Sequence, residues 1–316
     1  MEKILKRAIF EIESAQKIGL MTHVNGDGDA FGSLIGLQKI LKEFGKETLI
    51  FSSEPLLKEM EYLKNELDYN PSSRSEKIDL LIMLDVGVEK RLVCPEVYKS
   101  AKESGTRTLI IDHHAEGDMY DSVTSICRKV DVSSTSELVF WISQEMGLRL
   151  NKTIAELLLF GIETDTNFLK NPNTVNKTTY MAKSILLKYG ARVKKIKESV
   201  LEGSSINNLK FLGTIVTRAK MSPDGVMATF ITSNDLRRFK IDPGSSSSIS
   251  NFLDQTKDAK IVLVAEQRAE DKIKVSMRSN NSNANVAEIA SFFGGGGHVK
   301  AAGFEVEGDL VKMLGL

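Results

Sequence analysis

The chain has 316 residues, of which 41% are apolar and 27% are charged. At roughly 100 to 200 residues per domain, this length predicts two domains, and the composition excludes a fibrous or disordered chain. Lys plus Arg and Asp plus Glu are equal in number, at 42 each, so no overall basic field favours a long nucleic-acid duplex or an anionic membrane. The two cysteines, Cys94 and Cys127, are too few for a disulfide framework, which is typical of a reducing compartment.

The N-terminal segment predicts an amphipathic helix and not a targeting signal. Apolar side chains recur at helical spacing between Leu5 and Ala15, and charged residues interrupt any long apolar run. We therefore expect a cytoplasmic protein without a membrane-spanning segment.

Beyond this helix, short apolar runs alternate with helical patterns, and from residue 133 to about residue 201 the pattern is helical throughout. The alternation predicts an α/β domain, with a parallel sheet covered by helices on both faces. The run LLIML is apolar at every position, as expected of a central strand. The predicted strands are residues 20–23, 48–51, 80–84 and 108–111.

A second, smaller domain follows a polar stretch that contains glycine and serine. We expect residues 1–201 to form the first domain, 202–210 a linker and 211–316 the second domain. A strand at residues 226–232 and a hairpin formed by residues 261–277 predict a mixed-sheet α/β fold for this second part.

Chemically distinctive residues gather where the predicted strands end. The segment THVNGDGDAFGS follows the first strand and brings His23, Asp27 and Asp29 close together. One imidazole and two carboxylates suit Mn²⁺, Mg²⁺, Fe²⁺ or Zn²⁺. The alternative is that both aspartates only cap the helix expected at residues 30–44.

Three further segments carry similar residues. Asp85 directly follows the all-apolar strand, where a carboxylate needs a cation or several hydrogen-bond donors. Asp112, His113 and His114 follow the last predicted strand, and Asp165 lies in GIETDTNF near a helix end. The alternatives are a capping aspartate, a polar strand end with solvated histidines, and a surface helix cap.

Taken together, these segments supply more ligands than one metal ion needs. Two cations are accommodated if one carboxylate bridges them, as in two-metal phosphoryl hydrolysis. The absence of cysteine among the ligands argues against a structural zinc site. The candidate metal ligands are His23, Asp27, Asp29, Asp85, His113 and Asp165.

A glycine run near the C-terminus, GGGGHVKAAG, predicts an anion site. Four consecutive glycines expose backbone N–H groups without side-chain obstruction. The alternative is a flexible loop, but the adjacent His298 and Lys300 and the segment SMRS at residues 276–279 favour an anionic ligand.

The order of these motifs resembles the DHH phosphoesterase superfamily. THVNGDGDAFGS, the aspartate of LIMLDVG, the Asp-His-His triplet and GIETDTNF resemble its four motifs, and SMRS with GGGGHVKAAG resembles its DHH-associated C-terminal domain. The two-domain layout resembles the stand-alone nanoRNase and pAp phosphatase group, which includes hydrolases of pApA and cyclic di-AMP. Two departures are Gly26 in place of the usual proline and Asn167 in place of the usual glycine.

The resemblance implies a role for each candidate residue. His23, Asp27 and Asp85 would hold one Mn²⁺, and Asp29, Asp85, His113 and Asp165 the other, with Asp85 bridging. His114 would contact the scissile phosphate, Asp112 would orient it, and Arg91 would reach the substrate. The implied ligands of the 5′ phosphate or terminal nucleotide are Arg278, Ser279, Gly295, Gly296, Gly297 and His298.

We therefore expect a Mn²⁺-dependent phosphodiesterase that acts on short RNA or dinucleotides, with pAp as a second substrate. Mg²⁺ or another divalent cation could replace Mn²⁺, and homodimer formation stays open. The alternatives are a cyclic dinucleotide phosphodiesterase, an inorganic pyrophosphatase, a RecJ-like exonuclease and a catalytically silent nucleotide sensor. A long-strand exonuclease would need a basic track that a neutral chain does not suggest.

Overall fold

The computed structural model describes residues 2–74, 76–169, 175–201, 206–269, 271–280 and 284–310. The chain forms two compact units, Met1–Leu201 and Glu202–Leu316. The linker expected at residues 202–210 needs correction, because α8 (Ile206–Thr217) already begins inside it. Ile206 and Leu209 in the first turn of α8 are exposed, so this turn lacks the buried stripe by which a helix is recognised. Residues 202–205 lie outside the described residues.

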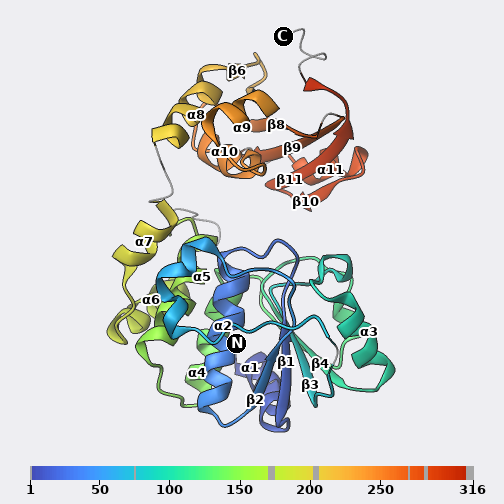
Figure 1. Ribbon diagram of the computed structural model, residues 1–316, viewed down its shortest axis with the longest axis vertical. Coiled ribbons are helices and arrows are strands. Elements are labelled where there is room, and N and C mark those ends of the chain that lie inside the picture. The colour runs from blue at the N-terminus through green and yellow to red at the C-terminus, as the bar shows by residue number, and fades with distance from the viewer. Residues whose placement is uncertain are drawn as a thin grey trace. The chain divides into compact units, whose positions relative to one another are not determined.

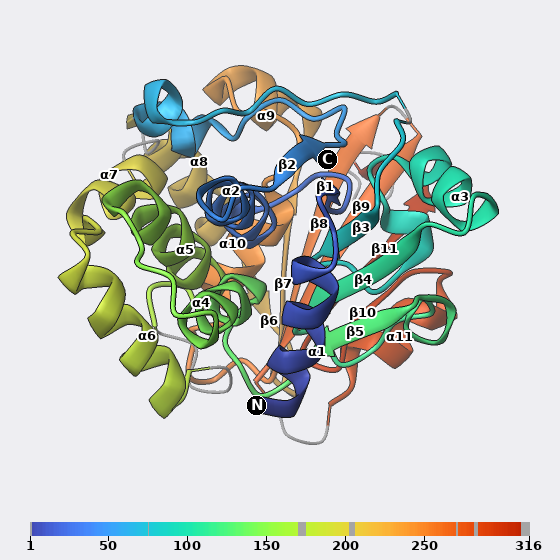
Figure 2. The same ribbon diagram turned by 90° about the horizontal axis from the view of Figure 1, so that it is seen from below.

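The first unit is built on a five-stranded sheet with the strand order β2-β1-β3-β4-β5. Every neighbouring pair is parallel, as the sequence predicts. Figures 1 and 2 show helices on both sides of this sheet. The strands are β1 (Lys17–Met21), β2 (Glu47–Ile50), β3 (Leu80–Leu84), β4 (Arg107–Asp112) and β5 (Ser125–Arg128). The α-helices are α1 (Glu2–Glu13), α2 (Gly28–Glu43), α3 (Pro95–Glu103), α4 (Thr135–Glu145), α5 (Lys152–Asp165), α6 (Lys177–Lys188) and α7 (Val193–Leu201).

The central strand β3 shows why the run LLIML is continuously apolar. All five of its residues are buried. Leu80, Ile82 and Leu84 pack into the core beneath α2, α4 and α5, whereas Leu81 and Met83 pack against residues of α3 on the other face. A strand covered on both faces has no polar face, so the period-2 alternation disappears.

The sequence did not predict β5, which lies at one edge of the sheet. Its four residues alternate between buried and half-buried and include Ser125 and Arg128, so no apolar run marks it. The buried Ser125 hydroxyl donates to Glu11 on α1 at 2.7 Å, which ties this edge to the first helix. None of the helices in the described part of the chain is long and apolar enough to cross a membrane.

The second unit contains a mixed sheet with the order β10-β11-β9-β8-β7-β6. β7 and β8 pair in parallel, and the other neighbours are antiparallel. The predicted strand at residues 226–232 and the predicted hairpin are present, and part of the glycine run forms the unpredicted edge strand β10. The strands are β6 (Lys220–Met221), β7 (Val226–Ile231), β8 (Ile261–Ala269), β9 (Lys272–Ser279), β10 (Gly296–His298) and β11 (Ala301–Glu307). The remaining helices are α9 (Ser233–Phe239), α10 (Ser246–Leu253) and α11 (Val286–Phe292).

Candidate active site and nucleotide pocket

The candidate residues of the first unit meet at the carboxyl-terminal edge of the parallel sheet. His23 follows β1, Asp85 follows β3, and Asp112 ends β4 with the two histidines directly after it. Open parallel sheets place ligand sites at this edge, because the loops that leave neighbouring strands converge there. The start of α2 and the end of α5, which carries Asp165, complete the cluster.

The two aspartates at the start of α2 have different environments. Asp27 is the N-cap, and its Oδ1 accepts the N–H groups of Asp29 and Ala30 at 3.1 Å, so Asp27 does cap α2, while its carboxylate also lies among the possible metal ligands. Asp29 is buried, and its two carboxylate oxygens accept the N–H groups of Thr135 and Ser136 at 2.7 and 2.9 Å. The positive N-terminal end of α4 therefore holds the Asp29 carboxylate in place.

Gly161 of α5 makes room for this arrangement. A Cβ atom at Gly161 would lie 2.0 Å from the Ser136 hydroxyl oxygen and 2.8 Å from Asp29 Oδ1. These separations are shorter than real contacts allow, so α5 can approach α2 and α4 this closely only with glycine at the position.

Asp85 lies at the centre of the cluster with 2% of its surface exposed. Its φ angle of 58° is in the left-handed region, which aspartate tolerates better than most residues. Thr135 Oγ1 donates to Oδ1 at 2.9 Å, and His23 Nε2 lies 3.5 Å from Oδ2. Burial alone would raise the pKa of Asp85, but the hydrogen bond from His23 and the charge of His113 hold this pKa below its usual range.

A buried hydrogen-bond network fixes His114. Asp112 Oδ1 accepts from His114 Nδ1 at 2.7 Å, and Oδ2 accepts from the Tyr120 hydroxyl at 2.7 Å. With the proton on Nδ1, the ring keeps a single orientation and a single tautomer. Burial lowers the pKa of His114, but the hydrogen bond and charge of Asp112 outweigh this effect, and the net pKa is raised.

Like charges crowd the other side of the cluster. His113 Nε2 lies 3.6 Å from Asp85 Oδ1 and 3.8 Å from Asp165 Oδ2. Burial and the charge of Asp85 raise the pKa of Asp29 to about 7. Burial and the charge of Asp29 raise the pKa of Asp165 well above its usual value. These carboxylates lack sufficient positive charge of their own, which a divalent cation would supply.

Ligand atoms converge in three groups of three residues, with all atoms of a group within 4.8 Å of one another. Asp85 belongs to two of the groups, as a bridging ligand would. The donors are carboxylate oxygens and imidazole nitrogens, a set suited to divalent cations such as Mg²⁺, Mn²⁺ or Zn²⁺. The groups are His23, Asp27 and Asp85; Asp85, His113 and His114; and Asp29, His113 and Asp165.

Arg91 lies beside the first of these groups. Its backbone carbonyl accepts the Val24 N–H at 2.8 Å, which fixes the loop that carries His23. Its side-chain Nη2 lies 3.2 Å from His23 Nδ1, and this imidazole nitrogen lies 2.9 Å from the Val24 carbonyl oxygen. His23 Nδ1 either accepts from Arg91 or, when protonated, donates to the Val24 carbonyl, and the second arrangement, with no proton on Nε2, leaves that nitrogen able to bind a cation.

Asn167 follows Asp165 in the left-handed region, with a φ angle of 48°. Glycine is the usual residue in such a conformation, and asparagine is among the side chains that tolerate it best. Asparagine at position 167, where the resemblance leads one to expect glycine, is therefore compatible with the turn after Asp165.

Sequence reasoning missed three residues that support the site: Thr135, Ser136 and Tyr120. The segment SSTSE carried a signal for the first two, because serine or threonine before an apolar helical stretch marks a helix N-terminus. Ser134 does cap α4, accepting the Glu137 N–H at 3.0 Å. Nothing in the sequence near Tyr120 indicates its contact with Asp112.

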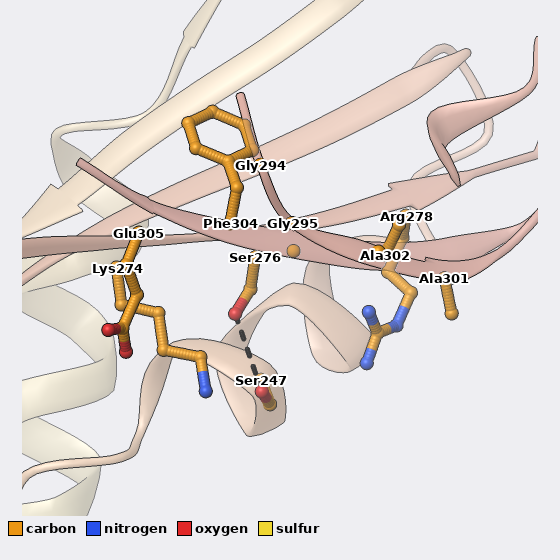
Figure 3. Close-up of a pocket in the computed structure, with 12 residues that line it drawn as sticks. Ser247, Lys274, Ser276, Arg278, Gly294, Gly295, Ala301, Ala302, Phe304 and Glu305 are labelled. Atoms are coloured by element: carbon orange, nitrogen blue, oxygen red, sulfur yellow. Dashed lines mark hydrogen bonds between the residues drawn. The ribbon is translucent and has the colours of Figure 1, made fainter. Parts of the chain in front are cut away.

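The second unit has its own pocket of about 500 Å³ on the face of the sheet that α10 covers. Alternation along β9 directs Lys274, Ser276 and Arg278 into this pocket, as Figure 3 shows. Arg278 Nε donates to Asn251 on α10 at 2.6 Å, which orients the guanidinium group. Ser276 and Ser247 lie between the two ends, with their hydroxyl oxygens 3.3 Å apart.

Contrary to the sequence prediction, the glycine run does not present all of its N–H groups to an anion. The N–H groups of Gly294 and Gly295 donate to the Ser291 and Ala290 carbonyls at 3.0 and 2.8 Å, so they satisfy the end of α11. Gly295 and Gly296 line the pocket, whereas Gly297 is not among its lining residues. A Cβ atom at Gly296 would meet only open space, so its absence leaves the backbone bare on that side.

Ser279 and His298 were also predicted to contact a ligand in this pocket. Ser279 lies on the opposite face of β9 from Arg278, because successive side chains of a strand alternate. Its hydroxyl donates to the Ala284 carbonyl at 3.1 Å, and it is not among the residues that line the pocket. The His298 side chain lies outside the described residues, although its backbone is part of β10.

Comparison with known proteins places both units in one family. Residues 17–162 match the family model described as the DHH family, N-terminal domain, and residues 224–314 match the DHHA1 domain. The chain is 29% identical to the bifunctional oligoribonuclease and PAP phosphatase NrnA of Bacillus subtilis, over 91% of this chain and 88% of that protein. It is 27% identical to NrnA of Thermus thermophilus, over 92% of this chain and 84% of that protein.

Solved structures agree with this placement. A crystal structure of an exopolyphosphatase-related protein from Bacteroides fragilis has a TM-score of 0.87 and 26% identity, covering 100% of this chain and 94% of that one. RecJ from Thermus thermophilus in complex with Mn²⁺ has a TM-score of 0.54 and 15% identity, over 96% of this chain and 52% of RecJ, which supports the fold alone. The chain belongs to the DHH superfamily of phosphoesterases, with a DHHA1 domain as its second unit.

Proposed function

We propose that the protein is a Mn²⁺-dependent phosphodiesterase that converts short oligonucleotides, such as nanoRNA and pApA, to mononucleotides and also hydrolyses pAp. The observation that carries this proposal is the cluster of three ligand groups, two of which share the buried Asp85. The separate pocket in the second unit, with Arg278 at one end, adds a site for a nucleotide. Relatives that match nearly the whole chain are named oligoribonuclease and PAP phosphatase.

The proposed metal sites follow the geometry of the cluster. His23, Asp27 and Asp85 would hold one cation, and Asp29, His113 and Asp165 would hold a second together with Asp85, which lies 3.6 Å from His113. Two such cations supply a nucleophile at neutral pH and stabilise charge on the phosphoryl oxygens. Thr135 and the N-terminus of α4 keep the carboxylates oriented, because hydrogen bonds to ligands tune and fix a metal site.

The remaining residues of the first unit act on the scissile phosphate. His114 donates a hydrogen bond to a phosphoryl oxygen, and its raised pKa favours the protonated form that donates. Asp112 acts through His114, since its carboxylate is buried and already accepts three hydrogen bonds from residues 113 and 114. Arg91 is exposed beside His23 and reaches a more distant phosphate of the substrate.

In the second unit, Arg278 binds the terminal phosphate or nucleotide, and the bare backbone at Gly296 allows the ligand to approach closely. His298 is retained from the sequence prediction. Ser279 and Gly297 are not retained as direct contacts, because neither lines the pocket.

A panel of substrates tests this function directly. The full-length protein is assayed with pApA, a longer RNA, pAp and cyclic di-AMP, each with Mn²⁺ and with Mg²⁺. The proposal predicts the highest kcat/KM for pApA with Mn²⁺ and measurable release of phosphate from pAp. Faster hydrolysis of cyclic di-AMP or of the long RNA would instead assign a cyclic dinucleotide phosphodiesterase or a general exonuclease. Binding without hydrolysis of any substrate would indicate a nucleotide sensor.

The cytoplasmic location and the homodimer stay predictions. Light scattering coupled to size-exclusion chromatography measures the mass in solution, to be compared with 35.0 kDa for one chain.

A further inference from the structure

One row of the pocket in the second unit carries two opposite charges. Lys274 on β9 and Glu305 on β11 are direct partners in the antiparallel register, and both line the pocket. Figure 3 shows them together at the end of the pocket away from Arg278. The pocket therefore has a cationic end and a second end with both a donor and an acceptor.

Lys274 and Glu305 form no ion pair with each other within the part of the chain that the structure describes, although their strands place them opposite one another. Cross-strand neighbours of opposite charge normally pair. Figure 3 shows that the Lys274 ammonium group extends toward Ser247 of α10, whereas the Glu305 carboxylate points away from Ser247. Both charged groups are thus available to a ligand in the pocket.

The distance between the two ends suits a single nucleotide. Lys274 and Arg278 lie four residues apart on β9, which corresponds to about 13 Å at about 3.3 Å per residue. A nucleotide that lay along the strand with its phosphate at Arg278 would pass its ribose over Ser276 and Ser247 and direct the edge of its base toward Lys274 and Glu305, all of which line the pocket.

We propose that Lys274 and Glu305 read the base of the bound nucleotide and select guanine. This inference rests on the proposed nucleotide substrate and adds base specificity to it. Guanine presents two adjacent N–H donors, N1–H and N2–H, beside the acceptor O6. The carboxylate of Glu305 accepts from both donors, and the ammonium of Lys274 donates to O6, so all three polar groups are paired.

The other three bases cannot form all of these hydrogen bonds with Lys274 and Glu305. Adenine offers one amino group, and its N1 lone pair would face a carboxylate oxygen. Uracil offers one N–H between two carbonyls, and cytosine offers one amino group beside an acceptor nitrogen. Because Glu305 is exposed, the cost of each mismatch is at the low end for a bidentate contact, about tenfold in affinity.

The test compares guanine and adenine substrates on the full-length protein. Wild-type protein with Mn²⁺ is expected to hydrolyse pGpG with about tenfold higher kcat/KM than pApA, with the inosine dinucleotide between them because it lacks the 2-amino group. Glu305→Gln should abolish the preference, since an amide pairs with adenine N1 and the adenine amino group as well as with guanine N1–H and O6. Lys274→Met should reduce the preference for guanine.

Matched controls come from the next row of the same sheet. Glu307 and Lys272 are also direct partners on β11 and β9, but neither lines the pocket. Glu307→Gln and Lys272→Met should therefore keep the wild-type ratio of pGpG to pApA hydrolysis. Equal wild-type rates for the two dinucleotides, or the same ratio in Glu305→Gln as in Glu307→Gln, would overturn base selection by this row.

Binding of GMP and AMP in EDTA separates this inference from the proposed hydrolysis. Tighter binding of GMP by about tenfold, lost in Glu305→Gln, supports base reading even if neither dinucleotide is cleaved, in which case only the proposed phosphodiesterase fails. Equal binding of the two mononucleotides, or binding of neither, overturns the inference whatever the hydrolysis results.

Discussion

The two candidate sites of this molecule are built in different ways. The metal cluster of the first unit draws its residues from the ends of strands and helices spread between His23 and Asp165, and at its centre Asp29 and Asp85 are buried and held by hydrogen bonds. The pocket of the second unit is formed mainly on one face of one sheet, and it opens to solvent at Glu305.

Because the two sites are built differently, substitutions in them should have different effects on activity. In the cluster, a carboxylate such as Asp29 is fixed by two backbone N–H groups, so removing one side chain disturbs several others. In the pocket, a side chain acts more independently, and the alternation of the strand decides whether it faces the ligand at all. Substitutions should therefore have large, coupled effects in the first site and smaller, substrate-dependent effects in the second.

The largest expected effect is that of Asp85→Asn. Asp85 is a proposed ligand of both cations, because it lies with His23 and Asp27 and its Oδ1 is 3.6 Å from His113 Nε2, so its neutral substitute should weaken both sites at once. We expect loss of detectable hydrolysis, a larger effect than the roughly 10- to 100-fold cost of losing an outer partner of a metal ligand. Two cations per chain by metal analysis, together with near-normal turnover, would show that Asp85 does not bridge.

Thr135→Val tests the coupling within the cluster without removing a proposed ligand. Valine keeps the shape of threonine but cannot donate to Asp85 Oδ1, which lies 2.9 Å from the Thr135 hydroxyl. Calorimetry should show Mn²⁺ affinity reduced by about 10- to 100-fold. Thr135→Ser retains the hydroxyl and should bind Mn²⁺ nearly as well as the wild type. Equal losses in both variants would indicate a packing effect instead.

The pH dependence of stability is also specific to the cluster. The raised pKa of Asp29, about 7 against an ordinary 3.8, means that the folded protein without metal binds a proton which the unfolded chain releases between these values. The free energy of unfolding therefore falls as pH rises through this window. The raised pKa values of His23 and His113 act in the same direction, since their stabilising charge is lost as pH rises.

Thermal unfolding in EDTA at about pH 5 and about pH 8 measures this effect, with a lower Tm expected at the higher pH. Added Mn²⁺ should reverse the trend, because cations bind the deprotonated ligands more tightly as pH rises. A Tm in EDTA that increases between the two pH values would contradict the proposed charge balance of the cluster.

The contrast between the sites also explains how much the sequence could predict. LLIML followed by Asp85 predicts a buried strand and a desolvated carboxylate, and the structure has both. The support from Thr135 and Tyr120 depends on segments that only the fold brings to Asp85 and Asp112. Likewise, four glycines predict exposed N–H groups, but the two that donate to the end of α11 are known only from the structure.

Arg278→Gln tests the independence of the pocket. Loss of a hydrogen bond to a charged phosphate costs about 1.5 to 3 kcal/mol, so kcat/KM for pApA should fall by roughly 10- to 150-fold. A small generic diester such as bis-nitrophenyl phosphate lacks a nucleotide for the pocket to hold, and its hydrolysis should fall much less. Equal losses for both substrates would mean that the two units do not divide recognition and chemistry.

The smallest effect on substrate hydrolysis is expected for Ser279→Ala. This variant tests whether the face of β9, and not membership of the SMRS motif, decides which residues contact the nucleotide. Arg278 and Ser279 are adjacent in SMRS, but only Arg278 lines the pocket, while the Ser279 hydroxyl donates to the Ala284 carbonyl. Loss of this bond should lower the free energy of unfolding by about 0.5 to 1.5 kcal/mol. The KM for pApA should stay within about twofold of the wild type, because no ligand contact is removed. A rise in KM as large as that of Arg278→Gln, without loss of stability, would return Ser279 to the nucleotide site and would contradict the assignment of the two faces by strand alternation.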